Sequence, residues 1–270
     1  MKLSVFFDHV LQAQEQTGKT LEELLVGVRA AGIEAVEINL SYLTGNPEIL
    51  DLLKQNELNI SCIYEFYDMG HCDETEKSRK HIETAVQVGA ARILVVPGFL
   101  SGEDSERMQE VMPHGEWVTE FFERNSEIQN MKSGLSYIAT LGKEKGITVT
   151  VEDFDDRNSP LSGMYGIWWF LQQVPELRYT LDTGNFLFYG EDVFDAWELL
   201  SERIAHVHCK DRCGANQASV QTGSGYIPFG KILYRLQKKQ YDGYLAIEHF
   251  DVEGQEVCMK QSAEFLRGLL

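Results

Sequence analysis

Four residues of the kinds that bind divalent metal ions occur at regular intervals in the second half of the sequence. Each follows or ends a short run of β-branched and apolar residues, and the four are Glu152, Asp182, His208 and Glu248. Successive members are 30, 26 and 40 residues apart, and each interval can hold about one strand and one helix. The four residues would therefore lie side by side if these strands were parallel neighbours in one sheet.

Three carboxylates beside an imidazole in a partly dry pocket would repel one another strongly unless a cation lay between them. The set therefore predicts one bound divalent metal ion. Oxygen-rich ligands with one nitrogen suit Mn²⁺, Mg²⁺ or Co²⁺, and Zn²⁺ is also compatible. A lone acidic residue at a strand end more often belongs to a turn, which would be the better interpretation of Asp182 by itself. The metal site is predicted by the four residues together.

Eight short runs in the sequence predict strands. Longer amphipathic stretches separate them, and a glycine that can end a helix precedes several of them, as Gly146 does. A helix is predicted to begin after Thr20, because Thr20 and Glu23 form a capping-box pattern. The predicted strands are Leu3–Phe7, Glu34–Ile38, Asn59–Tyr64, Arg92–Val96, Ile147–Val151, Arg178–Leu181, Ile204–His208 and Tyr244–Ile247.

Eight strand–helix units in this length of chain predict an α/β fold of the (β/α)8 barrel class, formed as a single domain by residues 1–270. An open, doubly wound sheet usually carries a glycine-rich turn after its first strand, and Phe7-Asp8-His9-Val10 has no glycine. In a parallel barrel, the carboxyl ends of all strands open onto one face. The four candidate ligands are therefore expected to converge there.

One segment departs from the regular alternation. Residues Phe99–Gly115 contain Gly102, Glu103, Asp104 and Glu106, and we expect a charged loop there, followed by a long helical segment up to Lys145. A loop in this position would project over the mouth of the barrel. The sequence leaves open whether it is a lid, an oligomer contact or a solvated insertion.

Composition limits the classes of partner. Lys and Arg total 24 against 42 Asp and Glu, and the net charge of −18 repels nucleic acid and anionic membranes. The five cysteines are scattered and odd in number, which favours reduced thiols. A charge and a histidine follow the first few apolar residues, and no stretch approaches 18 apolar residues, so we expect a cytoplasmic protein.

Five motifs in the second half of the chain, taken in order and spacing, resemble the xylose isomerase-like sugar phosphate isomerase/epimerase superfamily, the barrels of AP endonuclease 2 type. The likeness spans nearly the whole chain. The motifs are Val149-Thr150-Val151-Glu152-Asp153, Leu181-Asp182-Thr183-Gly184-Asn185, His206-Val207-His208-Cys209-Lys210-Asp211, Gly223-Ser224-Gly225 before Ile227-Pro228-Phe229, and Tyr241-Asp242-Gly243-Tyr244-Leu245-Ala246-Ile247-Glu248.

The resemblance implies that Glu152, Asp182, His208 and Glu248 hold a divalent metal ion and that the two glutamates act as an acid–base pair. General carbonyl chemistry supports these roles, because a metal ion chelated by adjacent carbonyl and hydroxyl oxygens acidifies the C–H bond between them. Two carboxylates can then remove and return the proton. The expected reaction is isomerisation or epimerisation of a sugar or polyol ketone through an enediolate.

Two further residues are candidates for substrate binding. Many relatives have histidine at the position of Asn185, which can hydrogen-bond a sugar hydroxyl but cannot act as acid or base. Lys210 should share the face of His208, where it could hold a substrate oxyanion or phosphate, or form an ion pair with Asp211 or Asp182.

Three alternative functions stay open. A lyase of the inosose or dehydroshikimate dehydratase type would abstract the same proton and then lose a β-hydroxyl. A non-catalytic metabolite-binding barrel would keep the metal pocket without turnover. An endonuclease IV-like nuclease is disfavoured, because its extra histidines are missing; the fourth predicted strand, for example, ends Val95-Val96-Pro97-Gly98. A homo-oligomer is also left open.

Other conspicuous residues are interpreted as structural. We expect His206 and Cys209 to be packing residues turned away from the face of His208. Gly223-Ser224-Gly225 is interpreted as a plain turn in preference to a phosphate cradle. Trp168 and Trp169 are expected to pack a helix onto the barrel.

Overall fold

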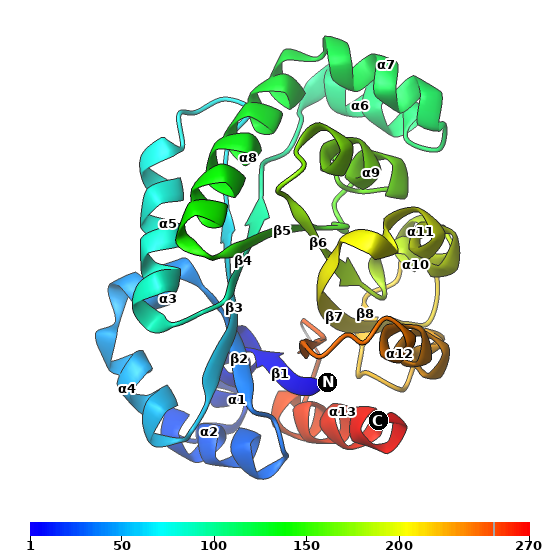
Figure 1. The fold of residues 1–270 in the computed structure, drawn as a ribbon. Helices are drawn as coiled ribbons and strands as arrows, with labels where there is room; N and C mark the ends of the chain where they lie inside the picture. Colours follow the sequence, from blue (N-terminus) through cyan, green and yellow to red (C-terminus); the bar gives the residue numbers. More distant parts are fainter. Residues whose placement is uncertain (251) are drawn as a thin grey trace.

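A closed barrel of parallel strands forms the centre of the molecule (Figure 1) in the computed structural model, which describes residues 1–250 and 252–270. Neighbouring strands follow the order β6-β5-β4-β3-β2-β1-β9-β7, and pairing of β6 with β7 closes the ring. This confirms the (β/α)8 barrel. The strands are β1 (Lys2–Phe6), β2 (Ala35–Asn39), β3 (Asn59–Phe66), β4 (Arg92–Val96), β5 (Thr148–Glu152), β6 (Arg178–Asp182), β7 (Ile204–Arg212) and β9 (Tyr244–Glu248).

Helices surround this ring (Figure 1), and a two-residue strand, β8 (Ser219–Val220), pairs antiparallel with the end of β7. In residues 1–250 and 252–270, no helix has the length and apolar character needed to cross a membrane. The helices are α1 (Phe7–Thr17), α2 (Leu21–Ala30), α3 (Leu40–Gly45), α4 (Pro47–Gln55), α5 (Thr75–Val88), α6 (Gly102–Val111), α7 (Gly115–Arg124), α8 (Ser126–Lys145), α9 (Met164–Gln173), α10 (Asn185–Tyr189), α11 (Val193–Leu200), η1 (Ser201–Arg203), α12 (Phe229–Lys238) and α13 (Gln255–Leu269).

Local sequence signals account for where helices begin and end. The Thr20 hydroxyl accepts a hydrogen bond from the Glu23 backbone N–H, and the Glu23 carboxylate accepts one from the Thr20 backbone N–H, which confirms the predicted capping box at α2. At the end of α8, Gly146 has φ of 71°, a conformation that favours glycine. Strand β5 then begins two residues later.

The two faces of the barrel strands have different roles. Outward-facing apolar residues such as Val151, Leu181 and Ile247 are buried against the helices in the main hydrophobic core. Trp169 is also buried in that core and Trp168 packs against it, so both tryptophans pack as predicted. Facing the barrel axis are buried polar residues, including Thr150 and Thr180, whose hydroxyls hydrogen-bond each other. The interior can therefore hold charged groups at its carboxyl end.

The segment expected to be a charged loop is largely helical. Gly102–Val111 forms α6 and Gly115–Arg124 forms α7, and the long helical segment to Lys145 is interrupted at Asn125, the N-cap of α8. The prediction failed because Glu103 and Asp104 were interpreted as solvated loop residues, whereas acidic groups favour the first turn of a helix. Met108 and Val111 then bury the inner face of α6.

Candidate metal centre

The four predicted ligands converge at the carboxyl end of the barrel. Glu152, Asp182 and Glu248 are the last residues of β5, β6 and β9, and His208 lies within β7, which pairs with both β6 and β9. One side-chain ligand atom from each lies within 4.8 Å of the others, and all four residues are buried. Residues distant in sequence thus form one compact set because the strands are parallel and adjacent.

Several buried atoms of this set point at one another. His208 Nδ1 lies 2.9 Å from Glu152 Oε2 and 3.0 Å from Glu248 Oε2. Among the described residues, His208 Nδ1, Glu248 Oε2 and Asp182 Oδ2 have no hydrogen-bond partner of acceptable geometry. Buried polar atoms without partners are costly, and carboxylate oxygens with one imidazole nitrogen are suitable donors for a divalent ion. The residues therefore fit a metal ion.

Electrostatics support the same conclusion. Burial raises the pKa of Glu152, and burial raises the pKa of Asp182 to about 7, with Glu248 and Glu152 adding to the effect. Burial and the charge of Asp182 also raise the pKa of the adjacent Asp153 well above its ordinary value. The carboxyl groups therefore resist being ionised together, and a cation would remove that conflict.

Lys210 supplies one positive charge next to this set. Its Nζ lies 2.6 Å from Glu248 Oε1 and 3.5 Å from Asp182 Oδ2. Burial disfavours the Glu248 carboxylate, but Lys210 and His208 together outweigh burial, and the pKa of Glu248 lies well below its ordinary value. Lys210 therefore does pair with Asp182, one of the two partners considered for it. The pair is buried, however, and Lys210 also lines the pocket.

Asn185 forms hydrogen bonds with two basic residues of the pocket, Lys210 and Arg212. It begins α10, and its Nδ2 donates to the backbone oxygen of Asp153 at 2.7 Å. Its Oδ1 accepts hydrogen bonds from Lys210 Nζ and from Arg212 Nη2, each at 3.1 Å. Asn185 and Lys210, the two residues predicted to bind substrate, therefore both line the pocket described next.

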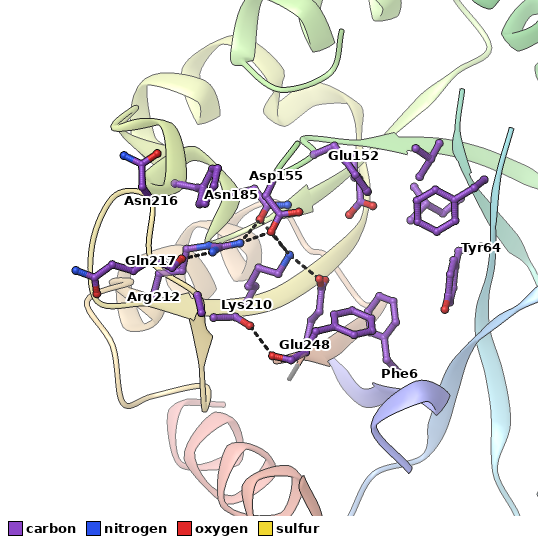
Figure 2. A pocket seen from close by; sticks show the side chains of 18 residues that line it. Phe6, Tyr64, Glu152, Asp155, Asn185, Lys210, Arg212, Asn216, Gln217 and Glu248 are labelled. Atoms are coloured by element: carbon purple, nitrogen blue, oxygen red, sulfur yellow. Dashed lines mark hydrogen bonds and ion pairs between the residues drawn. The ribbon is translucent and has the colours of Figure 1, made fainter. Parts of the chain in front are cut away.

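Two of the four candidate ligands line a pocket of about 500 Å³, and Figure 2 shows these two, Glu152 and Glu248, entering it from different strands. Aromatic rings form one wall. Successive ring centroids from Phe250 to Phe6, Tyr64, Phe66 and Phe154 are 5.4, 5.5, 6.2 and 5.8 Å apart. The Tyr64 hydroxyl donates to Asp8 Oδ2 at 2.7 Å.

The opposite wall is polar and contains two residues that were not predicted. Arg212 is buried, stacks on the ring of Phe188 and pairs with Asp155, a residue of the segment after β5. Asp155 also lies 3.2 Å from Lys210 Nζ. Arg212 could have been found from the same alternation that placed Lys210, since both lie at even positions along the strand that carries His208.

His206 does not face away from His208, and the prediction that it does is wrong. The two residues are two positions apart on β7, so strand alternation directs both side chains toward the barrel axis. His206 Nε2 lies 2.8 Å from Glu37 Oε2, and His208 Nε2 lies 3.1 Å from the same oxygen. Cys209 is buried in the hydrophobic core on the outer face, as predicted.

Glu37 was missed as a functional candidate. It lies on β2 and is fully buried. The signal was present in the sequence, because Ala35-Val36-Glu37-Ile38 places a carboxylate in an otherwise apolar strand. Such a residue needs a buried partner.

The glycine motif after β8 forms a turn around a carboxylate. The backbone N–H groups of Gly223 and Gly225 each donate to Asp211 Oδ2 at 2.8 Å. The turn interpretation is therefore confirmed, and these donors already bind an anion supplied by the chain itself.

The sequence matches the model of the family described as xylose isomerase-like TIM barrel over residues 27–269. An inosose dehydratase from Clostridium perfringens is 22% identical over 250 residues, covering 85% of this chain and 82% of that protein. This degree of identity extends over most of both chains.

Solved structures with the same fold include two enzymes. The D-psicose 3-epimerase of Clostridium cellulolyticum superposes with a TM-score of 0.76 at 14% identity, covering 100% of this chain and 99% of that one. A probable 3-DHS dehydratase from Bacillus anthracis gives 0.73 at 17% identity, with 99% of each chain covered. At these identities the structural likeness establishes the fold.

Proposed function

The chain belongs to the xylose isomerase-like TIM barrel family, and on that premise we propose that it is a divalent-metal-dependent sugar isomerase or epimerase. The reaction is a proton transfer next to a carbonyl, through an enediolate. The observation that carries the proposal is the buried cluster of Glu152, Asp182, His208 and Glu248, two of which, Glu152 and Glu248, line the pocket. Similarity to a D-psicose 3-epimerase supports the reaction class.

These four residues would hold the ion, which is Mn²⁺, Mg²⁺, Co²⁺ or Zn²⁺. A divalent cation supplies positive charge that favours the ionised form of a neighbouring carbon acid. Asp182 is well placed to stay in one orientation, because its Oδ1 accepts from the backbone N–H groups of Gly184 and Asn185 at 2.7 and 3.0 Å. Its other oxygen is left for the ion.

Glu152 and Glu248 are proposed as the acid–base pair. They extend from different strands, β5 and β9, into the same pocket (Figure 2), so a substrate between them can lose a proton to one and receive a proton from the other. Lys210, 2.6 Å from Glu248, stabilises its carboxylate form. Both glutamates are buried but line the open pocket, so the proton that each carries can exchange with solvent water between turnovers.

The proposed substrate is a sugar or polyol ketone. Lys210 and Asn185 would hydrogen-bond its oxygen atoms on the polar wall, and Arg212 adds a further donor. The aromatic wall from Phe6 to Phe154 offers ring faces for the C–H faces of a sugar. The alternative of a phosphorylated substrate has less support, since the Gly223 and Gly225 amides are occupied by Asp211.

A lyase is the second candidate, supported by similarity to an inosose dehydratase and a probable 3-DHS dehydratase. Abstraction of the same proton by a glutamate would be followed by loss of a β-hydroxyl. Glu152, whose pKa burial raises, is an acid in the pocket that would protonate the departing oxygen, which then leaves as water. The two functions thus share a first step and differ in the second.

Solvent deuterium exchange separates the candidates. The protein, loaded with Mn²⁺ or treated with a chelator, is incubated in heavy water with a panel of ketoses and cyclic polyol ketones. Metal-dependent incorporation of deuterium next to the carbonyl is expected. An enone absorbing in the ultraviolet would indicate a lyase. Retained metal without exchange or product would indicate a metabolite-binding barrel and contradict the proposal.

Cleavage of abasic-site DNA by the loaded protein would instead support the nuclease. With a net charge of −18 we propose that nucleic acid and anionic membranes are not partners. We also propose that the protein is cytoplasmic, which is supported by its five scattered cysteines. A homo-oligomer stays a prediction, which sedimentation tests.

A further inference from the structure

Glu37 is a charged residue at the centre of the barrel interior. Its side chain has no exposed surface, and its carboxylate lies against two imidazoles of β7. Glu37 Oε2 is 2.8 Å from His206 Nε2, and Oε1 and Oε2 are 3.2 and 3.1 Å from His208 Nε2. Within the described part of the chain, no lysine or arginine forms an ion pair with it. The two histidines, together with the buried Cys62 thiol, therefore provide its polar contacts.

His208 consequently has different neighbours at its two ring nitrogens. Nε2 contacts Glu37, whereas Nδ1 faces Glu152 and Glu248 in the candidate metal centre. A neutral imidazole carries one N–H donor and one acceptor nitrogen. If Nε2–H donates to Glu37, the lone pair of Nδ1 is directed at the metal centre.

The ring of His208 is also held from its sides. The Phe6 ring meets it edge to face at a centroid distance of 5.0 Å, and the His206 ring meets it at 5.4 Å with an interplanar angle of 87°. Packing of this kind limits rotation of the ring but does not distinguish its two nitrogens. A hydrogen bond does.

We propose that Glu37 is a positioning residue, which by accepting Nε2–H fixes the ring orientation and tautomer of His208 so that Nδ1 becomes the metal ligand. The inference rests on the proposed function, since it assumes that His208 binds a metal ion. His206 holds the carboxylate of Glu37 from the other side, at 2.8 Å. Carboxylates that orient a ligating histidine in this way typically change metal affinity 10- to 100-fold when removed.

One alternative uses the same atoms. Glu37, His206 and His208 are themselves close enough to hold an ion, since one ligand atom from each lies within 4.8 Å of the others. Such a site would require His208 Nε2 as a ligand, without its hydrogen. The proposal requires that His208 Nε2 carries a hydrogen, so an experiment that locates this hydrogen distinguishes the positioning role from a second metal site.

The first test compares Mn²⁺ affinity in two variants by titration calorimetry. Glu37→Gln removes the carboxylate, and Thr150→Val removes a buried interior hydroxyl whose contacts are Ile93 and Thr180. Glu37→Gln is expected to weaken Mn²⁺ binding by about 10- to 100-fold, and Thr150→Val to leave it near the wild-type value. Equal affinity in Glu37→Gln and wild type, or equal losses in both variants, would overturn the proposal.

The second test needs no substitution. In wild-type protein with ¹⁵N-labelled histidine, nuclear magnetic resonance identifies which nitrogen of His208 carries hydrogen, without metal and with diamagnetic Zn²⁺. The expected result is hydrogen on Nε2 in both states and a shift of Nδ1 on adding Zn²⁺. Zinc on Nε2, or two zinc ions per chain with one bound by Glu37, would contradict it.

Failure of the inference differs from failure of the proposed function. If wild-type protein binds no metal ion, the proposed function fails, while hydrogen on His208 Nε2 still reports the contact with Glu37. If the wild-type protein binds one ion and catalyses exchange, and Glu37→Gln binds the ion with the same affinity, the proposed function stands and the positioning role of Glu37 is wrong.

Discussion

At the scale of residues, the candidate metal centre joins four side chains at or near the ends of strands to two supporting carboxylates, Glu37 and Asp155, that reach β7 from other elements. Glu152, Asp182, His208 and Glu248 were found because each ends or follows a strand, and parallel strands bring such positions together. Glu37 was detectable as a carboxylate in an apolar strand, but its partners, like those of Asp155, depend on which strand and loop face β7. Spacing along the sequence does not report that arrangement.

The acid–base pair makes a prediction at this scale. Glu152→Gln and Glu248→Gln each keep the size of the side chain but remove the proton-transferring group. Each is expected to lower deuterium exchange by about 100-fold or more, because positioned acid–base groups contribute that much to rate. Mass spectrometry of the substrate measures the exchange, and circular dichroism checks the fold. Full exchange in either folded variant would refute its assigned role.

At the scale of elements, the number of strands was predictable and the layout of the long segment after β4 was not. Periodic apolar runs identified all eight barrel strands to within two residues at most boundaries, with β7 extending further, to Arg212. Helix α6 was missed because its acidic first turn resembles a solvated loop. Its identity as a helix depends on burial of Met108 and Val111, a tertiary effect.

Two helical glycines predict opposite effects on stability. A Cβ at Gly142 in α8 would lie 2.5 Å from Val149 Cγ2 and 2.8 Å from the Ile147 backbone oxygen, so Gly142→Ala should cost about 1–3 kcal/mol of unfolding free energy. Gly27 in α2 has no described atom within 4 Å of such a Cβ, and Gly27→Ala should stabilise by up to about 1 kcal/mol. Urea denaturation measures both, and equal effects would contradict this packing.

The contact between α5 and β3 predicts a pH dependence. His81 Nδ1 lies 2.9 Å from the Tyr67 hydroxyl and Nε2 lies 3.1 Å from the Ile63 backbone oxygen. Burial lowers the pKa of His81 to about 3, against an ordinary value of 6.5. Between these values the unfolded chain binds a proton that the folded chain does not, so stability falls as the pH falls.

His81→Gln should remove this contribution. Well below pH 6.5 but above about pH 3, the wild type is expected to lose about 1.4 kcal/mol more per pH unit than the variant. Denaturant titrations at several pH values measure the two slopes. Parallel slopes would show that the His81 pKa is not depressed in the folded protein.

At the scale of the whole molecule, the fold gathers buried acidic groups from β5, β6 and β9 into one cluster, in a chain that already carries a net charge of −18. Binding of a divalent ion should therefore stabilise the folded state. At an ion concentration 100 times Kd, the gain is about 2.7 kcal/mol, or roughly 5–10 °C in Tm. Calorimetric scans with Mn²⁺ and with a chelator measure it, and an unchanged Tm would be the opposing result.

The measurement that bears most directly on the metal centre is the stoichiometry and affinity of Mn²⁺ in Asp182→Asn beside Asp155→Asn. Both variants remove one negative charge from the pocket region, but only Asp182 belongs to the four ligands. Wild-type protein and Asp155→Asn are predicted to bind one Mn²⁺ per chain, and Asp182→Asn to bind it about 100-fold or more weakly, since a direct ligand is lost. Wild-type protein that binds no ion, or equal affinity in all three proteins, would contradict the proposed centre.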